Sequence, residues 1–146
     1  MPGLQPTRLV VPIDFSDQSF HALDQAIAMV APGGSIDVVH VLPSMSANDP
    51  ALLFGQATDH TRLNVVAEHL EKTLRERGYS TLQSHVLLGD AGSQIADFAR
   101  NHQAELIVIS SHGYGFIKRV LLGSVAERVV RLASCPVLVL RQSPKD

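Results

Sequence analysis

Leu106-Ile-Val-Ile-Ser-Ser-His-Gly113, followed after nine intervening residues by Gly123-Ser-Val-Ala-Glu127, predicts a strand, a loop and the start of a helix. The apolar run is typical of a buried strand, and the second glycine directly precedes a serine and an amphipathic pattern. Backbone N–H groups in a glycine-rich turn and at a helix N-terminus lack intrahelical acceptors, so they bind an anion without a lysine. The stretch therefore predicts a cradle for an anion such as phosphate.

Apolar runs and helical patterns alternate along the rest of the chain. Ser16 and Asp17 are suited to cap the first helix, and Pro32-Gly33-Gly34 is suited to end it. Strands are expected at residues 8–14, 36–41, 84–88, 106–110 and 137–140, with helices through residues 20–30, 63–74, 95–99 and 125–132.

The expected strands are nearly continuous apolar runs, which is typical of strands buried on both faces. Their alternation with helices implies right-handed crossovers, and hence an α/β fold with a parallel sheet covered by helices on both faces. For five strands we expect the order 3-2-1-4-5, with the topological switch point between the first and fourth strands. Asp14 and residues Ser110 to Gly113 follow these two strands, at the crevice where such sheets bind ligands.

Length and composition predict one domain over residues 1–146, with a core from about 8 to 141. The 146 residues are 45% hydrophobic and carry a formal net charge of −2, so we expect no nucleic-acid surface. No apolar stretch approaches the roughly 18 residues of a membrane span. The single cysteine, Cys135, excludes an internal disulfide and is interpreted as a packing residue, which fits a reducing, cytoplasmic location.

One segment is too long for a simple connection between a strand and a helix. Residues 43–59 include Pro43, Pro50, Gly55 and the apolar tetrad 51–54. Long segments of this kind are often lids or interaction elements, and the sequence leaves both interpretations open.

Two parts of the chain resemble the universal stress protein family. The first is Val11-Pro-Ile-Asp-Phe-Ser16 with Ser19. The second extends from His112-Gly113 through Leu121-Leu-Gly-Ser-Val-Ala-Glu-Arg128 and is followed by Cys135-Pro-Val-Leu-Val139. The resemblance extends from about residue 8 to residue 141. It implies a flavodoxin-like α/β fold and a role in the stress response.

ATP-binding members of that family carry the motif G-x2-G-x9-G-(S/T). Gly113, Gly123 and Ser124 match it, whereas Ser110 stands where the first glycine is expected. The resemblance implies that Asp14 contacts the ribose, that Pro12, Val41 and Ile109 flank the adenine, and that Gly113, Gly123, Ser124 and Val125 hold the phosphates. It also implies that Mg²⁺ or Mn²⁺, if bound, is held by the phosphates. His112 is either a structural loop residue or a further phosphate contact.

Ser110 leaves three interpretations open. If the motif needs a positive φ at this position, serine costs roughly 1–2 kcal/mol, or about tenfold in affinity. If the ligand needs a close approach to the backbone, the Cβ atom blocks the site. If neither applies, the hydroxyl adds a phosphate contact.

Other patterns point to catalysis or metal binding only weakly. Gly113-Tyr114-Gly115 lacks the third glycine of a dinucleotide fingerprint, and no P-loop is present. Ser110-Ser111-His112 lacks a nucleophile elbow, and we expect adjacent side chains there to diverge. The seven histidines do not cluster at metal-ligand spacing. Lys118 and Arg119 reach either the phosphates or solvent.

The functional prediction is a nucleotide-binding switch rather than an enzyme. Only Asp14 and His112 could orient a water molecule, so ATP hydrolysis should be slow at most. Asp14 could instead serve only to cap the first helix. Nucleotide occupancy would order residues 43–59 and 113–123 and change a surface that an unknown protein partner recognises. A nucleotide-free dimeric interaction protein is the alternative.

The last expected strand, Val137 to Leu140, forms an apolar edge of the predicted sheet. Such an edge favours pairing with a second copy of the chain. The family resemblance also implies a homodimer formed through this strand.

Overall fold

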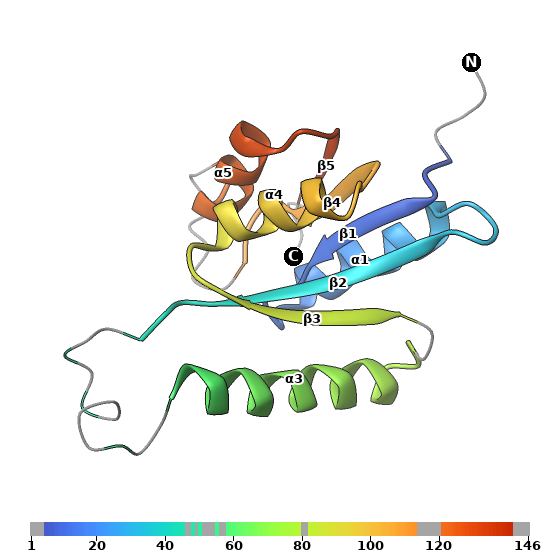
Figure 1. The fold of residues 1–146 in the computed structure, drawn as a ribbon. Helices are drawn as coiled ribbons and strands as arrows, with labels where there is room; N and C mark the ends of the chain where they lie inside the picture. Colours follow the sequence, from blue (N-terminus) through green and yellow to red (C-terminus); the bar gives the residue numbers. More distant parts are fainter. Residues whose placement is uncertain are drawn as a thin grey trace.

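A computed structural model describes residues 5–45, 48, 50, 55, 58–79, 82–113 and 121–141. The elements are β1 (Arg8–Pro12), α1 (Asp17–Met29), β2 (Ser35–Leu42), α3 (Asp59–Glu76), β3 (Gln83–Leu88), α4 (Ala91–Asn101), β4 (Leu106–Ser110), α5 (Ser124–Leu132) and β5 (Val137–Leu140), as Figure 1 shows. All strand pairs are parallel, and the sheet order is β3-β2-β1-β4-β5. The predicted fold class and strand order are therefore confirmed.

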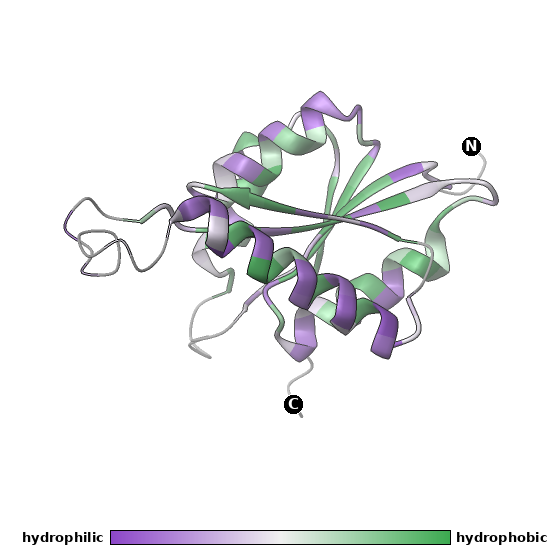
Figure 2. Ribbon diagram, turned by 60° about the horizontal axis from the view of Figure 1, so that its bottom comes forward, coloured by the Kyte–Doolittle hydropathy of each residue, from purple (hydrophilic) through white to green (hydrophobic). Residues whose placement is uncertain are grey.

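Two apolar cores lie on opposite faces of the sheet. Alternation along β1 directs Leu9 and Val11 to the face covered by α1 and α3, and Val10 to the face covered by α4 and α5. Figure 1 shows α3 on one side of the sheet and α4 with α5 on the other. Figure 2 shows the apolar residues concentrated in the strands and on the helix sides that face them. Burial on both faces explains why the strands are continuous apolar runs.

The first strand ends earlier than predicted, at Pro12 rather than Asp14. The Ile13 amide still donates to the Val39 carbonyl over 2.8 Å, but Phe15 adopts a φ of 67° and turns the chain. For a bulky side chain this left-handed conformation costs about 1–2 kcal/mol. Ser16 then caps α1 by accepting a hydrogen bond from the Ser19 amide, as the sequence predicts.

Helix α3 begins at Asp59, four residues before the apolar pattern at Leu63 starts. Thr58 caps it, because its side chain accepts from the Thr61 amide while Thr61 reaches back to the Thr58 amide. This reciprocal capping box extends the helix through a polar turn. Much of the preceding segment, which we interpreted as a lid or an interaction element, lies outside the described residues.

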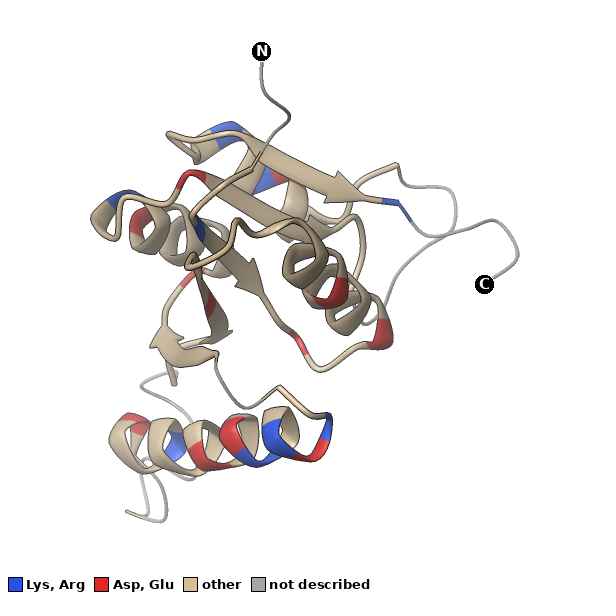
Figure 3. Cartoon of the chain, turned by 90° about the vertical axis from the view of Figure 1, so that its right-hand side faces the viewer, with Lys and Arg blue, Asp and Glu red and all other residues tan. Residues whose placement is uncertain are grey.

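Charges of both signs are mixed on the outer helix. Figure 3 shows acidic and basic residues interspersed along α3, where Arg62 pairs with Asp59 at 2.9 Å and Lys72 with Glu76 at 3.8 Å. Exposed pairs of this kind contribute about 0.3–0.5 kcal/mol each. Within the described part of the chain, no helix is both long enough and apolar enough to cross a bilayer.

Candidate functional site

A cavity of about 330 Å³ opens at the carboxyl ends of β1, β2 and β4, against the N-terminus of α5. This is the crevice that the strand order predicts. Its volume lies in the range of small-molecule sites. The cavity brings together every residue that the sequence analysis assigned to a binding role: Pro12, Asp14, Val41, Ile109, Ser110, His112, Gly113, Gly123, Ser124 and Val125.

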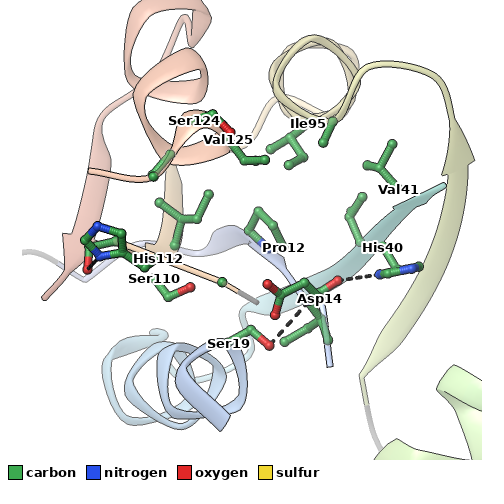
Figure 4. A pocket seen from close by; sticks show the side chains of 18 of the residues that line it. Pro12, Asp14, Ser19, His40, Val41, Ile95, Ser110, His112, Ser124 and Val125 are labelled. Carbon is green, nitrogen blue, oxygen red and sulfur yellow. Dashed lines mark hydrogen bonds between the residues drawn. The ribbon is translucent and has the colours of Figure 1, made fainter. Parts of the chain in front are cut away.

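One part of the cavity is apolar. Figure 4 shows Pro12 of β1, Val41 of β2, Ile95 of α4 and Val125 of α5 facing a common space. Ile109, 4% exposed at the end of β4, lines the same cavity. Aliphatic walls from several elements suit a flat, uncharged ring system.

A carboxylate lies at the opposite side of the cavity. Asp14 Oδ1 accepts hydrogen bonds from the backbone amide of Ser16, over 2.9 Å, and from the Ser16 hydroxyl. The Asp14 amide in turn donates to the Ser19 hydroxyl over 3.3 Å, which Figure 4 marks with a dashed line. Asp14 therefore supports the cap residue Ser16 rather than capping α1 directly.

Gly113 packs directly against this carboxylate. A Cβ atom built on Gly113 would lie 1.8 Å from Asp14 Oδ2. Gly113 is absent from the positive-φ glycines of the described chain, which are Gly33, Gly55, Gly78 and Gly89. The position therefore needs glycine for close approach and not for an unusual backbone conformation.

The N-terminus of α5 provides backbone donors. Gly123 is the N-cap residue, with φ −68° and ψ 164°, and no side chain caps the helix. The Gly123 amide donates to the Ser111 carbonyl over 2.7 Å. The next amides, of Ser124 and Val125, belong to the first turn, which has no intrahelical acceptors. They line the cavity at the positive end of the helix dipole, as an anion cradle requires.

A clamp on α4 holds α5 in place. Arg128 donates to Asp90 over 2.9 Å and to the Ser93 hydroxyl over 3.1 Å. Hydrogen bonds from Ser93, together with the Arg128 guanidinium, lower the pKa of Asp90. A Cβ atom on Gly92 would lie 2.5 Å from Arg128 Cβ, so the two helices pack closely here. No local sequence pattern indicates this contact, because Arg128 is 35 or more positions from Asp90 and Ser93.

Ser110 is the last residue of β4 and is 8% exposed. Among the described non-glycine residues only Phe15 and Gln103 have a positive φ, so Ser110 carries no left-handed strain. This excludes the first of the three interpretations of the missing glycine. Within the described chain the Ser110 hydroxyl has no hydrogen-bond partner, although it lines the cavity. A buried hydroxyl without a partner costs about 1–3 kcal/mol, which favours a ligand or water at this point.

The expectation that Ser111 and His112 diverge is wrong. Ser111 Oγ lies 3.1 Å from His112 Nδ1, within hydrogen-bond distance. The chain leaves the sheet at Ser111, whose amide still donates to the Leu140 carbonyl over 2.8 Å, so strand alternation no longer separates the two side chains. Ser111 is 2% exposed and holds His112 at the rim of the cavity.

Other candidate residues are placed as follows. Lys118 and Arg119 lie outside the described residues. Among the residues that the structure describes, no three His, Cys, Asp or Glu side chains are arranged to hold a metal ion.

Burial raises the pKa of the Cys135 thiol, and the side chain packs against the core beneath α4 and α5. His40 and Ile95 line the cavity but were not singled out, because their strand and helix positions carried no motif.

Comparisons with known proteins agree with this architecture. A family model described as the universal stress protein family matches residues 6–141. Universal stress protein MJ0531 of Methanocaldococcus jannaschii is 33% identical over 145 residues, covering 95% of this chain and 84% of the relative. The structure of universal stress protein UspA from Lactobacillus plantarum is 25% identical, with a TM-score of 0.75 and coverage of 94% and 99%. A family protein from Arabidopsis thaliana, determined with AMP bound, has a similar fold, with 18% identity, a TM-score of 0.61 and coverage of 96% and 94%.

Proposed function

The chain belongs to the universal stress protein family, and from this premise we propose that it is an adenine-nucleotide-binding regulator whose ligand is ATP. One observation carries the proposal. A single cavity combines an apolar slot, a carboxylate and an uncapped helix N-terminus, which are the chemistries that adenine, ribose and phosphate require. The AMP-bound relative supports the same class of ligand.

In this proposal the adenine lies between Pro12, Val41 and Ile109, and Asp14 accepts hydrogen bonds from the ribose hydroxyls. Gly113, Gly123, Ser124 and Val125 surround the phosphates, and the amides of Ser124 and Val125 donate to them, because the Gly123 amide already donates to the Ser111 carbonyl. The Ser110 hydroxyl and His112 add contacts at the side of the cavity between Asp14 and α5. These assignments use backbone donors for the negative charge, so they need no lysine.

A divalent ion would be held by the nucleotide rather than by the protein. Mg²⁺ and Mn²⁺ bind phosphate oxygens and water readily, and Mg²⁺ rarely occupies a dedicated protein cage. Asp14 and His112 are the only candidates that we assign for orienting water, and Asp14 is engaged with Ser16. We therefore propose a binding protein with slow ATP hydrolysis at most.

The first experiment is a calorimetric titration of the purified protein with ATP and Mg²⁺. We expect a micromolar Kd for the wild type. For Ser110→Ala we expect a Kd about tenfold higher, because one hydrogen bond to a charged phosphate is lost. Ser110→Gly serves as the matched variant, since it removes the Cβ atom together with the hydroxyl.

Two results would change the proposal. Tighter binding by Ser110→Gly than by the wild type would mean that the serine Cβ obstructs the ligand. Absence of wild-type binding up to millimolar ATP would overturn nucleotide binding. It would favour the alternative function, a nucleotide-free dimeric interaction protein, for which Ser110 in place of glycine is the supporting observation.

We further propose that the protein acts as a homodimer through β5. This strand pairs with β4 on one side and is the edge of the described sheet. The carbonyls of Pro136 and Leu140 accept bonds from Ile107 and Ser111 across β4. Because backbone groups alternate along a strand, the amides of Val137 and Val139 face outward, where a second copy could pair.

Val139→Pro tests this edge, because it removes an outward N–H while keeping the ladder to β4. We expect the variant to sediment as a monomer and the wild type as a dimer in analytical ultracentrifugation. Val139→Ala, which trims the side chain but keeps the N–H, should remain a dimer. A dimer that persists in Val139→Pro would place the interface elsewhere.

A further inference from the structure

His40 contacts the residues on both sides of Asp14. Its Nδ1 lies 2.6 Å from the carbonyl oxygen of Ile13, and its ring meets the Phe15 ring edge-on at a centroid distance of 4.9 Å. Figure 4 marks the first contact with a dashed line beside Asp14. A carbonyl oxygen only accepts hydrogen bonds, so Nδ1 carries the hydrogen and donates it.

The turn at Asp14 depends on support from outside the strand. Phe15 has a φ of 67°, which a bulky residue adopts only where its surroundings enforce it. Its ring lies against the rings of His40 of β2 and His69 of α3, each at a centroid distance of 4.9 Å. Strained residues that are held in this way cluster at functional sites.

Both peptide groups of Ile13 are also fixed by β2. The Ile13 amide donates to the Val39 carbonyl, and the Ile13 carbonyl accepts from the adjacent His40 side chain. Ile13 is 3% exposed, so water does not readily replace a lost donor at its carbonyl. The backbone that leads from β1 to Asp14 is therefore held on both sides of Ile13 by β2.

We propose that His40 is a positioning residue for Asp14 and thereby determines the preference of the site for a ribose over a dideoxyribose. The inference rests on the proposed nucleotide binding, and it adds a residue to which no binding role was assigned. His40, whose side chain also lines the cavity, acts in this proposal through the Ile13 carbonyl and the Phe15 ring. A purely structural histidine would instead affect all nucleotides equally.

The test compares the Kd for ATP with the Kd for 2′,3′-dideoxy-ATP, which keeps the base and the phosphates. We expect the wild type to prefer ATP by about tenfold, the value of hydrogen bonds to a charged carboxylate. His40→Phe keeps an aromatic ring but loses the donor. It should reduce the preference to about twofold or less, chiefly through weaker ATP binding, with dideoxy-ATP binding unchanged within about twofold.

His40→Asn is the matched rescue variant, because its amide N–H occupies nearly the same place as Nδ1–H. It should keep most of the ribose preference. If phenylalanine prevents folding, as a thermal melt would show, His40→Leu carries the same expectation. Asp14→Ala gives the reference for complete loss of the preference.

The outcomes separate the two proposals. If the wild type binds neither nucleotide, the proposed function fails and this inference fails with it. If the wild type prefers ATP and His40→Phe keeps that preference, only the role of His40 is overturned. Equal weakening of both nucleotides in His40→Phe, or loss of the preference in His40→Asn, would also overturn the positioning role.

Discussion

Gly123→Asp should abolish ATP binding without unfolding the protein. The Gly123 backbone, with φ −68° and ψ 164°, already has the extended conformation of an N-cap residue, so aspartate fits it without left-handed strain. Its carboxylate would accept hydrogen bonds from the first-turn amides of α5 and would repel the phosphates. We expect at least a 100-fold loss of affinity, since hydrogen bonds to charged groups contribute about 1.5–3 kcal/mol each. Calorimetry measures this loss.

Stability should change little in the same variant. Replacing an aspartate N-cap by glycine costs only a few tenths of a kcal/mol, and the reverse change should gain about as much. The new Cβ atom would lie 3.1 Å from the Ser111 carbonyl, which a small shift relieves. Gly123→Ala is the control, because it adds the same Cβ atom but leaves the amides free, and it should keep affinity within about fivefold. ATP binding by Gly123→Asp at wild-type strength would place the phosphates away from α5.

Gly113→Ala should have the second largest effect, through Asp14. The added Cβ atom would lie 1.8 Å from Asp14 Oδ2, so the carboxylate must rotate away. Rotation breaks the hydrogen bonds that Oδ1 accepts from the Ser16 amide and hydroxyl. We expect ATP binding to weaken by roughly 10- to 100-fold, and the free energy of unfolding to fall by about 1–2 kcal/mol. Calorimetry and urea denaturation measure the two effects.

A double-mutant cycle identifies the route of this effect. In an Asp14→Ala background the alanine at position 113 meets no carboxylate, so it should cost little further affinity. Additive losses of ATP affinity would show instead that Gly113 contacts the ligand independently of Asp14. The cycle thus separates close packing against Asp14 from the phosphate contact that the family resemblance implies.

The sheet could be predicted from the sequence because its signals are local. Each strand is a short apolar run, and each helix carries apolar residues at helical spacing, so element order and the parallel topology follow. The start of α5 could be predicted for the same reason, since Gly123-Ser124 marks it, whereas the binding of an anion there stays a prediction. The capping box of Thr58 and Thr61 is equally local, but it has threonine where glutamate or glutamine is usual, so the sequence pattern does not indicate it.

The side-chain hydrogen bonds that hold the elements around the cavity could not be predicted, because they join residues that are far apart in the sequence. His40 reaches the Ile13 carbonyl from the neighbouring strand β2, and Arg128 of α5 reaches Asp90 at the start of α4. The reason for glycine at position 113 is also tertiary, since it depends on the rotamer of Asp14. Strand alternation predicts that the side chains of Ser111 and His112 point apart. This prediction is wrong because the chain has already left the sheet at these residues.

The cavity takes its walls from β1 and β2 near the beginning of the chain and from β4 and α5 near its end. No partly folded intermediate that lacks either half can offer the complete site, so a nucleotide bound as proposed would stabilise only the finished fold. At a ligand concentration of 100 times Kd this stabilisation reaches about 2.7 kcal/mol. Resistance to proteolysis, and with it the lifetime of the protein in the cell, would then rise and fall with the nucleotide supply.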